Sequence, residues 1–216
     1  MAKLKVAVLI SGGGSNLQTL LDMCDHDDAP AEIVRVISNV PTAFGLERAE
    51  KSGVSTTVIN HKDYDSRESF EDALDHVLSS EKVDLVCLAG FMRLLTDGFV
   101  QKWKDRVINI HPALLPSFKG LHTHDRAIEA GVKFHGCTVH YVRPAMDEGP
   151  IIVQAAVPVL PNDTPDELQA RVLKEEHKIY PLALKLIAER KVRVSGEKVL
   201  YTGVDNLMES MINPEA

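Results

Sequence analysis

The sequence VAVLI at residues 6–10, followed by SGGGSN at 11–16, decides the fold. Five consecutive apolar residues predict a strand that is buried on both faces, as the strands of parallel sheets are. After the glycines, Leu17, Leu20 and Leu21 recur at helical spacing. A buried strand, a Gly-rich turn and an amphipathic helix together predict the first unit of a parallel α/β sheet.

Outward from this unit, strands and helices alternate with short connections. A capping box of Asp65 with Glu68 is expected to begin the clearest amphipathic helix. This alternation predicts a Rossmann-like, doubly wound, mostly parallel sheet with right-handed crossovers and helices on both faces. The further strands are predicted at 33–38, 56–59, 83–89 and 107–110, with another helix at 43–51.

The order changes in the second half of the chain. A short helix is expected before Gly131, and residues 136–142 and 151–157 predict two antiparallel strands added to the sheet. The sequence TPDE at 164–167 predicts the capped start of a long helix, which Pro181 should kink or break.

The end of the chain has a different pattern. Residues 192–201 predict a hairpin, and the tail to Ala216 is expected to be frayed. We therefore expect one domain over residues 1–190, with lobes at 1–104 and 105–190, followed by a hairpin and tail at 191–216.

Composition limits the function. With 24 Lys and Arg against 31 Asp and Glu, the net charge is -7, and only 5% of the residues are aromatic. Neither a basic surface nor a stacking platform for nucleic acid is indicated. Three widely spaced cysteines in apolar runs predict buried free thiols in a reducing compartment. No run approaches the roughly 20 apolar residues of a membrane span, so we expect a cytoplasmic protein without a membrane partner.

The Gly-rich turn favours a phosphate ligand, because it presents backbone N–H groups beside the positive end of a helix. The dinucleotide pattern GxGxxG fails at Leu17, and the second strand ends in Ser38-Asn39 rather than in an acid. The Walker pattern also fails, so a lone phosphate monoester is favoured over NAD or ATP. The alternative is that the glycines only permit the turn, although three in succession exceed that need.

Asn109 and His111 are two residues apart at the end of a predicted strand, so both side chains project from one face. Pro112 restricts His111 to extended backbone. Ligands bind at the carboxyl ends of strands in open α/β sheets. The alternatives are a hydrogen-bonded structural histidine and a metal hydrolase using His122, His124, His140 and Asp147, for which no ligand spacing is recognisable. We therefore predict no metal.

Four motifs in sequence order carry a family resemblance. They are SGGGSN at 11–16, AGFMR at 89–93, NIHPALLP at 109–116 and DEGP at 147–150. The chain resembles the folate-dependent formyltransferases over about residues 4–190. The Asn-His-Pro and Asp-Gly-Pro signals are shared across the family, whereas the GGGSN turn and EEH at 175–177 point to a ribonucleotide acceptor.

The resemblance implies transfer of a formyl group from 10-formyltetrahydrofolate to the amine of glycinamide ribonucleotide in purine synthesis, without metal, NAD or ATP. The first lobe would bind the nucleotide phosphate, and the second would bind folate and carry catalysis. Asn109 and His111 would stabilise the tetrahedral oxyanion, while Asp147 would pair with His111 and relay the amine proton.

Family positions also imply the binding residues. The ribonucleotide would contact Gly14, Ser15, Asn16 and Glu176. Folate would contact Arg67, Met92, Arg93, Leu94, Leu95, Asn109, Arg143, Pro144, Ala145, Met146 and Asp147. Taken singly, Arg67 is also explained as a solvated helix residue, Met92 as a core residue and Asp147 as a turn residue.

One residue departs from the family pattern. Glu148 stands where family members often have glycine, and a second carboxylate beside Asp147 is expected to change the pH profile.

Other functions stay open. A methionyl-tRNA formyltransferase would be expected to add a basic domain, and a formyltetrahydrofolate hydrolase an amino-terminal regulatory domain; the sequence shows neither. A formyltransferase with another amine acceptor and a nucleotide-binding module without catalysis are the remaining alternatives. We expect small-molecule substrates and a monomer or weak homodimer.

Overall fold

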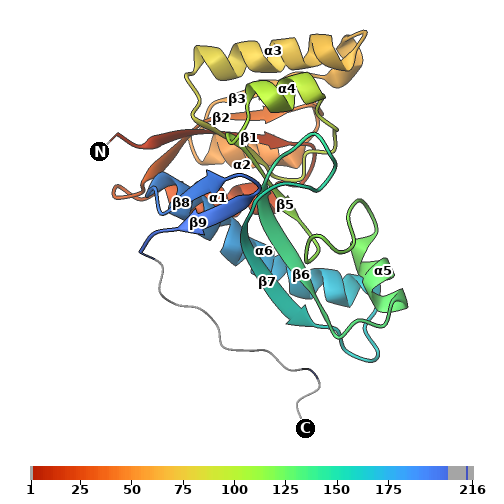
Figure 1. Ribbon diagram of the computed structural model, residues 1–216. Helices are drawn as coiled ribbons and strands as arrows, with labels where there is room; N and C mark the ends of the chain where they lie inside the picture. The colour runs from red at the N-terminus through yellow and green to blue at the C-terminus, as the bar shows by residue number, and fades with distance from the viewer. Residues whose placement is uncertain (1, 204–212, 214–216) are drawn as a thin grey trace.

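The computed structural model describes residues 2–203 and residue 213. A seven-stranded sheet has the order β3-β2-β1-β4-β5-β6-β7, with parallel pairing from β3 to β5 and with β6 antiparallel to both β5 and β7 (Figure 1). The strands are β1 (Leu4–Ile10), β2 (Ala31–Ser38), β3 (Thr56–Val58), β4 (Leu85–Leu88), β5 (Val107–His111), β6 (Phe134–Tyr141) and β7 (Ile151–Pro158). The predicted mostly parallel sheet with antiparallel strands in its second half is confirmed.

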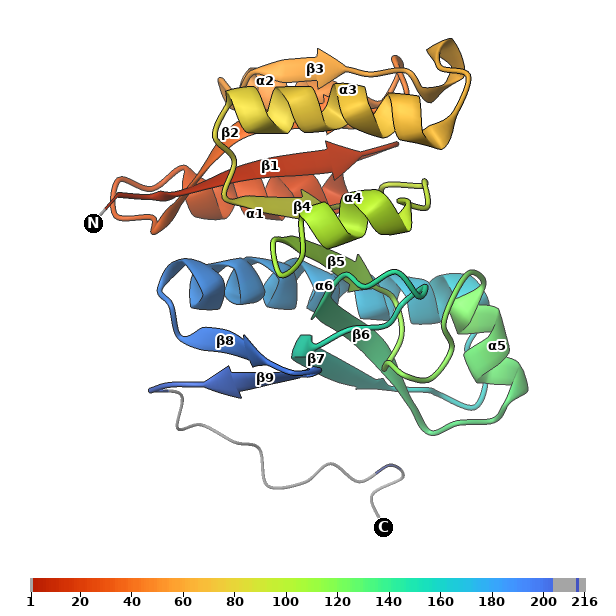
Figure 2. The same cartoon turned by 45° about the horizontal axis from the view of Figure 1, so that its top comes forward.

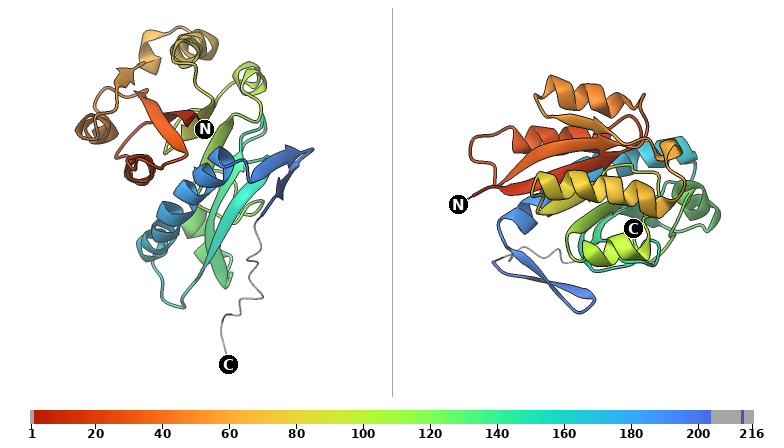
Figure 3. Two further views of the ribbon diagram at one scale, coloured as in Figure 1. Left: turned by 90° about the vertical axis from the view of Figure 1, so that its left-hand side faces the viewer. Right: turned by 90° about the horizontal axis from the view of Figure 1, so that it is seen from above.

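Helices cover both faces of this sheet, as the doubly wound prediction requires. Along β1, Val6 and Val8 pack with α1, α2 and α6, whereas Ala7 and Leu9 pack with α3 and α4 (Figures 2 and 3). All four side chains are fully buried, because a central strand has a helix layer on each side. The helices are α1 (Ser15–Cys24), α2 (Phe44–Lys51), α3 (Arg67–Ser80), α4 (Asp97–Lys102), α5 (Thr123–Glu129) and α6 (Pro165–Ala188).

The ends of the helices correct one prediction and confirm another. The capping box of α3 is formed by Ser66 with Ser69, not by Asp65 with Glu68. Ser66 has extended backbone and accepts from the Ser69 N–H, so the helix begins one residue later than predicted. At α6, the predicted capping box of Thr164 with Glu167 is present.

Pro181 does not break α6, which continues to Ala188. A proline inside a helix costs about 3 kcal/mol. Here the adjacent Tyr180 is fully buried, and its hydroxyl donates to the Leu88 carbonyl oxygen 2.9 Å away. Packing of α6 on the sheet therefore offsets the local cost of the proline.

One further helix and a separate two-stranded sheet complete the fold. Helix α4 was not predicted, and Thr96 caps it by accepting from the Phe99 N–H. As predicted, β8 (Val192–Ser195) and β9 (Lys198–Tyr201) pair antiparallel, while the predicted frayed tail lies outside the described residues except Asn213. In the part of the chain that the structure describes, no helix is long and apolar enough to cross a membrane.

The sheet order reverses between β1 and β4, so the turns after these strands meet at one edge. The Ser11 N–H donates to the Gly90 carbonyl oxygen at 3.1 Å, and the Met92 N–H donates to Ser11 Oγ at 2.8 Å. In open α/β sheets, ligands bind at this reversal point. The fold thus brings the Gly-rich turn next to residues 90–92.

Candidate active site

The Gly-rich turn contains glycines of two kinds. Gly14 has φ 70°, and a Cβ there would lie 2.8 Å from the Gly45 Cα, so this position requires glycine. Gly12 and Gly13 are exposed, and a Cβ at either would meet no atom within 4 Å. Close packing against Gly45 therefore explains why residue 14 is a glycine. Gly12 and Gly13 have no such neighbour, and they leave the backbone accessible to a ligand.

Asn16, in the first turn of α1, joins the turn to α6. Its Nδ2 donates to Glu176 Oε2 at 2.7 Å, across 160 residues of sequence. Burial raises the pKa of Glu176, and the hydrogen bond from Asn16 lowers it in part. The side-chain oxygen of Asn16 is buried and has no hydrogen-bond partner among the residues that the structure describes. A buried, unpaired acceptor next to an open turn is suited to a donor group on a ligand.

His111 and Asp147 meet at the carboxyl end of β5. His111 is 5% exposed, and its Nδ1 lies 3.5 Å from Asp147 Oδ1. Its Nε2 lies 3.0 Å from the Phe118 carbonyl oxygen, which can only accept, so Nε2 carries a hydrogen. Because both ring nitrogens face acceptor oxygens, both can donate only in the imidazolium form. The predicted pairing of His111 with Asp147 is therefore present in the geometry.

Asn109 lies opposite His140 in the β5–β6 pair, and its Nδ2 is 3.4 Å from His140 Nε2. His140 Nδ1 donates to the Tyr141 carbonyl oxygen at 3.0 Å, so Nε2 of a neutral ring is the acceptor. Burial lowers the pKa of His140, which keeps the ring neutral, although the contact with the Tyr141 backbone raises it in part. This contact orients the Asn109 amide and leaves its second N–H available as a donor.

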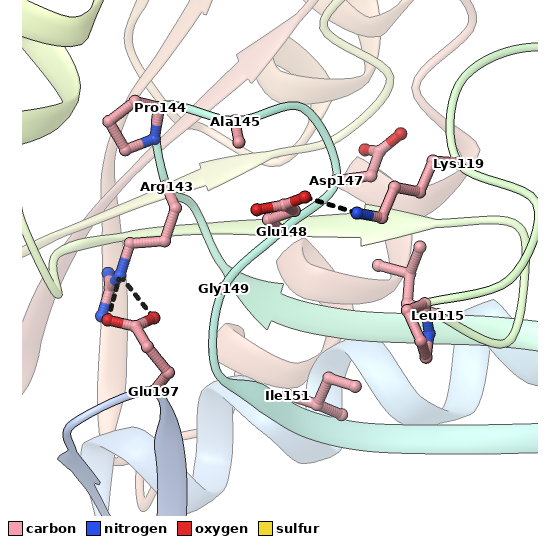
Figure 4. Close-up of a pocket in the computed structure, with 11 residues that line it drawn as sticks. Leu115, Lys119, Arg143, Pro144, Ala145, Asp147, Glu148, Gly149, Ile151 and Glu197 are labelled. Carbon is pink, nitrogen blue, oxygen red and sulfur yellow. Dashed lines mark hydrogen bonds and ion pairs between the residues drawn. The ribbon is translucent and has the colours of Figure 1, made fainter.

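Two contacts join the 112–122 segment to the turn that carries Asp147. The Gly120 N–H donates to Asp147 Oδ2 at 2.7 Å, and Lys119 Nζ lies 2.6 Å from Glu148 Oε1 (Figure 4). Glu148, the departure from the family pattern, is therefore paired with a lysine. That pairing reduces the field of the second carboxylate at Asp147. Its effect on the pH profile stays a prediction.

Cavities lie on both sides of the 143–149 turn. One, of about 610 Å³, includes Leu115, Ile151, Glu197 and the predicted folate residues Arg143, Pro144, Ala145 and Asp147 in its lining (Figure 4). The other, of about 540 Å³, includes the predicted residues Arg67, Leu94, Leu95, Pro144 and Met146.

The structure groups most, but not all, of the predicted folate residues. Met92, Arg93 and Asn109 line neither cavity. Met92 is 71% exposed, which excludes its alternative reading as a core residue. Leu94 and Met146 are also exposed apolar side chains, and exposed apolar groups at a cavity favour an apolar ligand.

The histidines that were considered as metal ligands do not form a cluster around one point in the described residues. His122 is exposed, whereas the His124 ring packs edge-on against His135 at 5.3 Å between centroids. Within residues 2–203 and residue 213, no group of three His, Cys, Asp or Glu side chains is placed to hold a metal ion.

Sequence reasoning missed several residues at the site. His140 was considered only as a metal ligand, and Arg48, whose Nε donates to the Gly13 carbonyl oxygen at 2.8 Å, was not considered. Lys119 and Glu197 were also missed. The register of β5 against β6 would have revealed His140, because it sets His140 opposite Asn109.

An open Gly-rich turn, a histidine paired with a carboxylate and an oriented amide N–H lie at one edge of a doubly wound sheet. Fold and site together define an α/β enzyme equipped for acyl transfer, in which an oxyanion needs hydrogen-bond donors.

Comparison with known proteins identifies the family. The model of the formyl transferase family matches residues 4–184. Phosphoribosylglycinamide formyltransferase of Haemophilus influenzae is 45% identical over 199 residues, covering 92% of this chain and 94% of that protein. The chain therefore belongs to the formyl transferase family, as the sequence motifs predicted.

Two further relatives extend the comparison. Glycinamide ribonucleotide transformylase 1 from Symbiobacterium toebii has a crystal structure that is similar with a TM-score of 0.89 at 47% identity, covering 92% of this chain and 94% of that one. The human trifunctional purine biosynthetic protein adenosine-3 is 52% identical over 192 residues. This match covers 89% of our chain and 19% of the human protein, so the chain spans about a fifth of that relative's length.

Proposed function

We propose that this chain transfers the formyl group of 10-formyltetrahydrofolate to the amine of glycinamide ribonucleotide. The products are formylglycinamide ribonucleotide and tetrahydrofolate, in the purine pathway. The observation that carries the proposal is the placement of His111, Asp147 and Asn109 at one strand end, beside the Gly-rich turn and the 143–149 turn. The names of the relatives at 44–53% identity support this acceptor.

The ribonucleotide phosphate binds at the Gly-rich turn, with Gly14, Ser15 and Asn16 as its contacts. Supporting this are the open positions at Gly12 and Gly13 and the start of α1 directly after them. Glu176 is 7% exposed, and its carboxyl group accepts hydrogen bonds from ribose hydroxyls or from the glycinamide group.

Folate binds along the 143–149 turn, between the apolar side chains of Met92, Leu94 and Leu95 and the Asp147 carboxylate. Arg67 and Arg93 provide charge for the glutamate end of the donor. The remaining contacts are those predicted from the family, namely Met92, Leu94, Leu95, Asn109, Arg143, Pro144, Ala145 and Met146. The proposed reaction needs no metal, NAD or ATP.

In the reaction, the amine nitrogen attacks the formyl carbon, and the carbonyl oxygen becomes an oxyanion. The second N–H of Asn109 and Nε2–H of His111 stabilise it. The Phe118 carbonyl oxygen occupies the acceptor position at Nε2, so the formyl oxygen replaces it there. Asp147 relays the proton leaving the amine, the bond from the carbon to folate N10 breaks, and N10 gains a proton.

The test is absorbance-monitored formyl transfer with glycinamide ribonucleotide, with another primary amine and with no acceptor. Turnover that depends on the ribonucleotide supports the proposal. Turnover without acceptor indicates a formyltetrahydrofolate hydrolase, and turnover with the other amine indicates a different acceptor. No turnover, together with a thermal shift by the ribonucleotide, indicates a nucleotide-binding module.

Other predictions complete the proposal. The division into lobes at 1–104 and 105–190, the cytoplasmic location and the monomer or weak homodimer stay predictions. The cysteines Cys24, Cys87 and Cys137 are free, which supports a reducing compartment.

A further inference from the structure

Arg143 begins the turn at 143–149 that carries Asp147, and its side chain is held by two carboxylates. Its side chain is 11% exposed, its Nη2 lies 2.8 Å from Asp105 Oδ1, and its Nε lies 3.1 Å from Glu197 Oε2. Figure 4 shows Glu197 reaching Arg143 from the hairpin below the turn. The two carboxylates come from segments 38 and 54 residues away in sequence.

Glu197 lies at the tip of the β8–β9 hairpin, which has a second attachment to the catalytic half of the sheet. The Tyr201 hydroxyl donates to the Ile152 carbonyl oxygen in β7, just after the 143–149 turn. Within the hairpin, the Thr202 N–H donates to the Lys191 carbonyl oxygen at 2.9 Å. The hairpin is therefore attached at the start of the turn, where Glu197 contacts Arg143, and just after its end, where Tyr201 contacts Ile152.

The turn needs such ties because its backbone is unfavourable by itself. Asp147 has φ 52° and Gly149 has φ 121°, both in the region that L side chains avoid. A non-glycine residue such as Asp147 is strained in this region, so contacts from outside the turn help to maintain it. Arg143 is anchored to such contacts at the opposite end of the turn from Asp147.

We propose that Glu197 and Asp105 are positioning residues for the donor site, acting through Arg143. They hold the turn so that Asp147 faces His111 and residues 144–146 border the cavities. This inference rests on the proposed function and assigns the C-terminal hairpin a part in it. A guanidinium this little exposed is poorly solvated, so losing both carboxylates leaves its charge uncompensated and releases the turn.

The test compares Glu197→Gln, Asp105→Asn and the double variant with wild type. Arg193→Gln, an exposed position in the same hairpin, is the matched control. Each single variant is expected to raise the KM for 10-formyltetrahydrofolate about 2- to 5-fold, as for one exposed ion pair. The double variant should raise it about 10-fold or more. The KM for the ribonucleotide should not change, which distinguishes positioning of the donor site from a general loss of structure.

Amide hydrogen exchange over 143–149 is measured in the same proteins. Faster exchange in the double variant, but not in Arg193→Gln, is expected. If wild type shows no formyl transfer, the proposed function fails while exchange still decides whether the carboxylates hold the turn. An unchanged donor KM with unchanged exchange in the double variant would overturn the positioning role.

Discussion

Asn109 and His140 face each other across β5 and β6, with Asn109 Nδ2 3.4 Å from the Nε2 of a buried histidine. The neutral ring accepts one amide hydrogen and thereby fixes which way the other points. The proposed oxyanion donor is thus oriented by His140.

Replacing His140 should lower the rate because the Asn109 amide loses its partner. We expect His140→Leu to reduce kcat about 10-fold, as for loss of one orienting hydrogen bond. His140→Gln retains an acceptor near the Nε2 position and should keep most of the rate. Steady-state kinetics at saturating substrates checks this, and equal rates in the two variants would contradict it.

Two substitutions in the Gly-rich turn should have different effects, one on folding stability and the other on ribonucleotide binding. Gly14→Ala should destabilise the protein by at least about 1 kcal/mol, because of its positive φ and the approach of Gly45. Gly13→Ala should leave the urea midpoint unchanged but weaken ribonucleotide binding, since its methyl group projects into the proposed phosphate site. If Gly13→Ala bound the ribonucleotide like wild type, the phosphate site would lie elsewhere.

Replacing Glu176 should weaken ribonucleotide binding without lowering folding stability. Burial raises the pKa of its carboxyl group, so the ionised form is unfavourable in the folded protein at neutral pH. Glu176→Gln should therefore unfold at equal or higher urea than wild type. The KM for the ribonucleotide should rise about 10-fold or more, as for loss of a charged hydrogen-bond acceptor. A lower urea midpoint with normal KM would indicate a purely structural role.

The lowered pKa of His135 should make folding stability depend on pH. Its side chain is fully buried, and burial lowers its pKa to about 4 from 6.5. Between these values the unfolded chain binds a proton that the folded chain does not, so stability falls as pH decreases from about 6.5 to about 4. His135→Phe removes this group and should flatten the pH profile.

Urea unfolding at pH 7.5 and pH 5 measures the effect of His135. The dependence should be reduced rather than abolished, because burial also lowers the pKa of His124 and of His140. A variant as pH-sensitive as wild type would contradict the assignment.

Much of the fold could be predicted because buried parallel strands are continuous apolar runs, as at residues 6–10. The start of α3 could not, since Asp65 and Ser66 are adjacent and both are good caps. The continuity of α6 through Pro181 depends on burial of Tyr180, which no local pattern reveals.

The site was predictable where its residues are close in sequence. Asn109 and His111 share one strand, and the Gly-rich turn directly follows β1. The contacts of His140 with Asn109 and of Glu197 with Arg143 depend on strand register and hairpin docking, which tertiary packing determines. The pairing of Glu148 with Lys119 was likewise hidden.

The central claim is that Asn109 and His111 stabilise the oxyanion of formyl transfer. The direct measurement is kcat for transfer to glycinamide ribonucleotide in Asn109→Ala and His111→Ala, with urea unfolding of the same proteins. The account predicts a loss of about 10²- to 10³-fold in kcat, or roughly 3 to 4 kcal/mol, with a much smaller loss in folding stability. Wild-type turnover in either purified variant would contradict it.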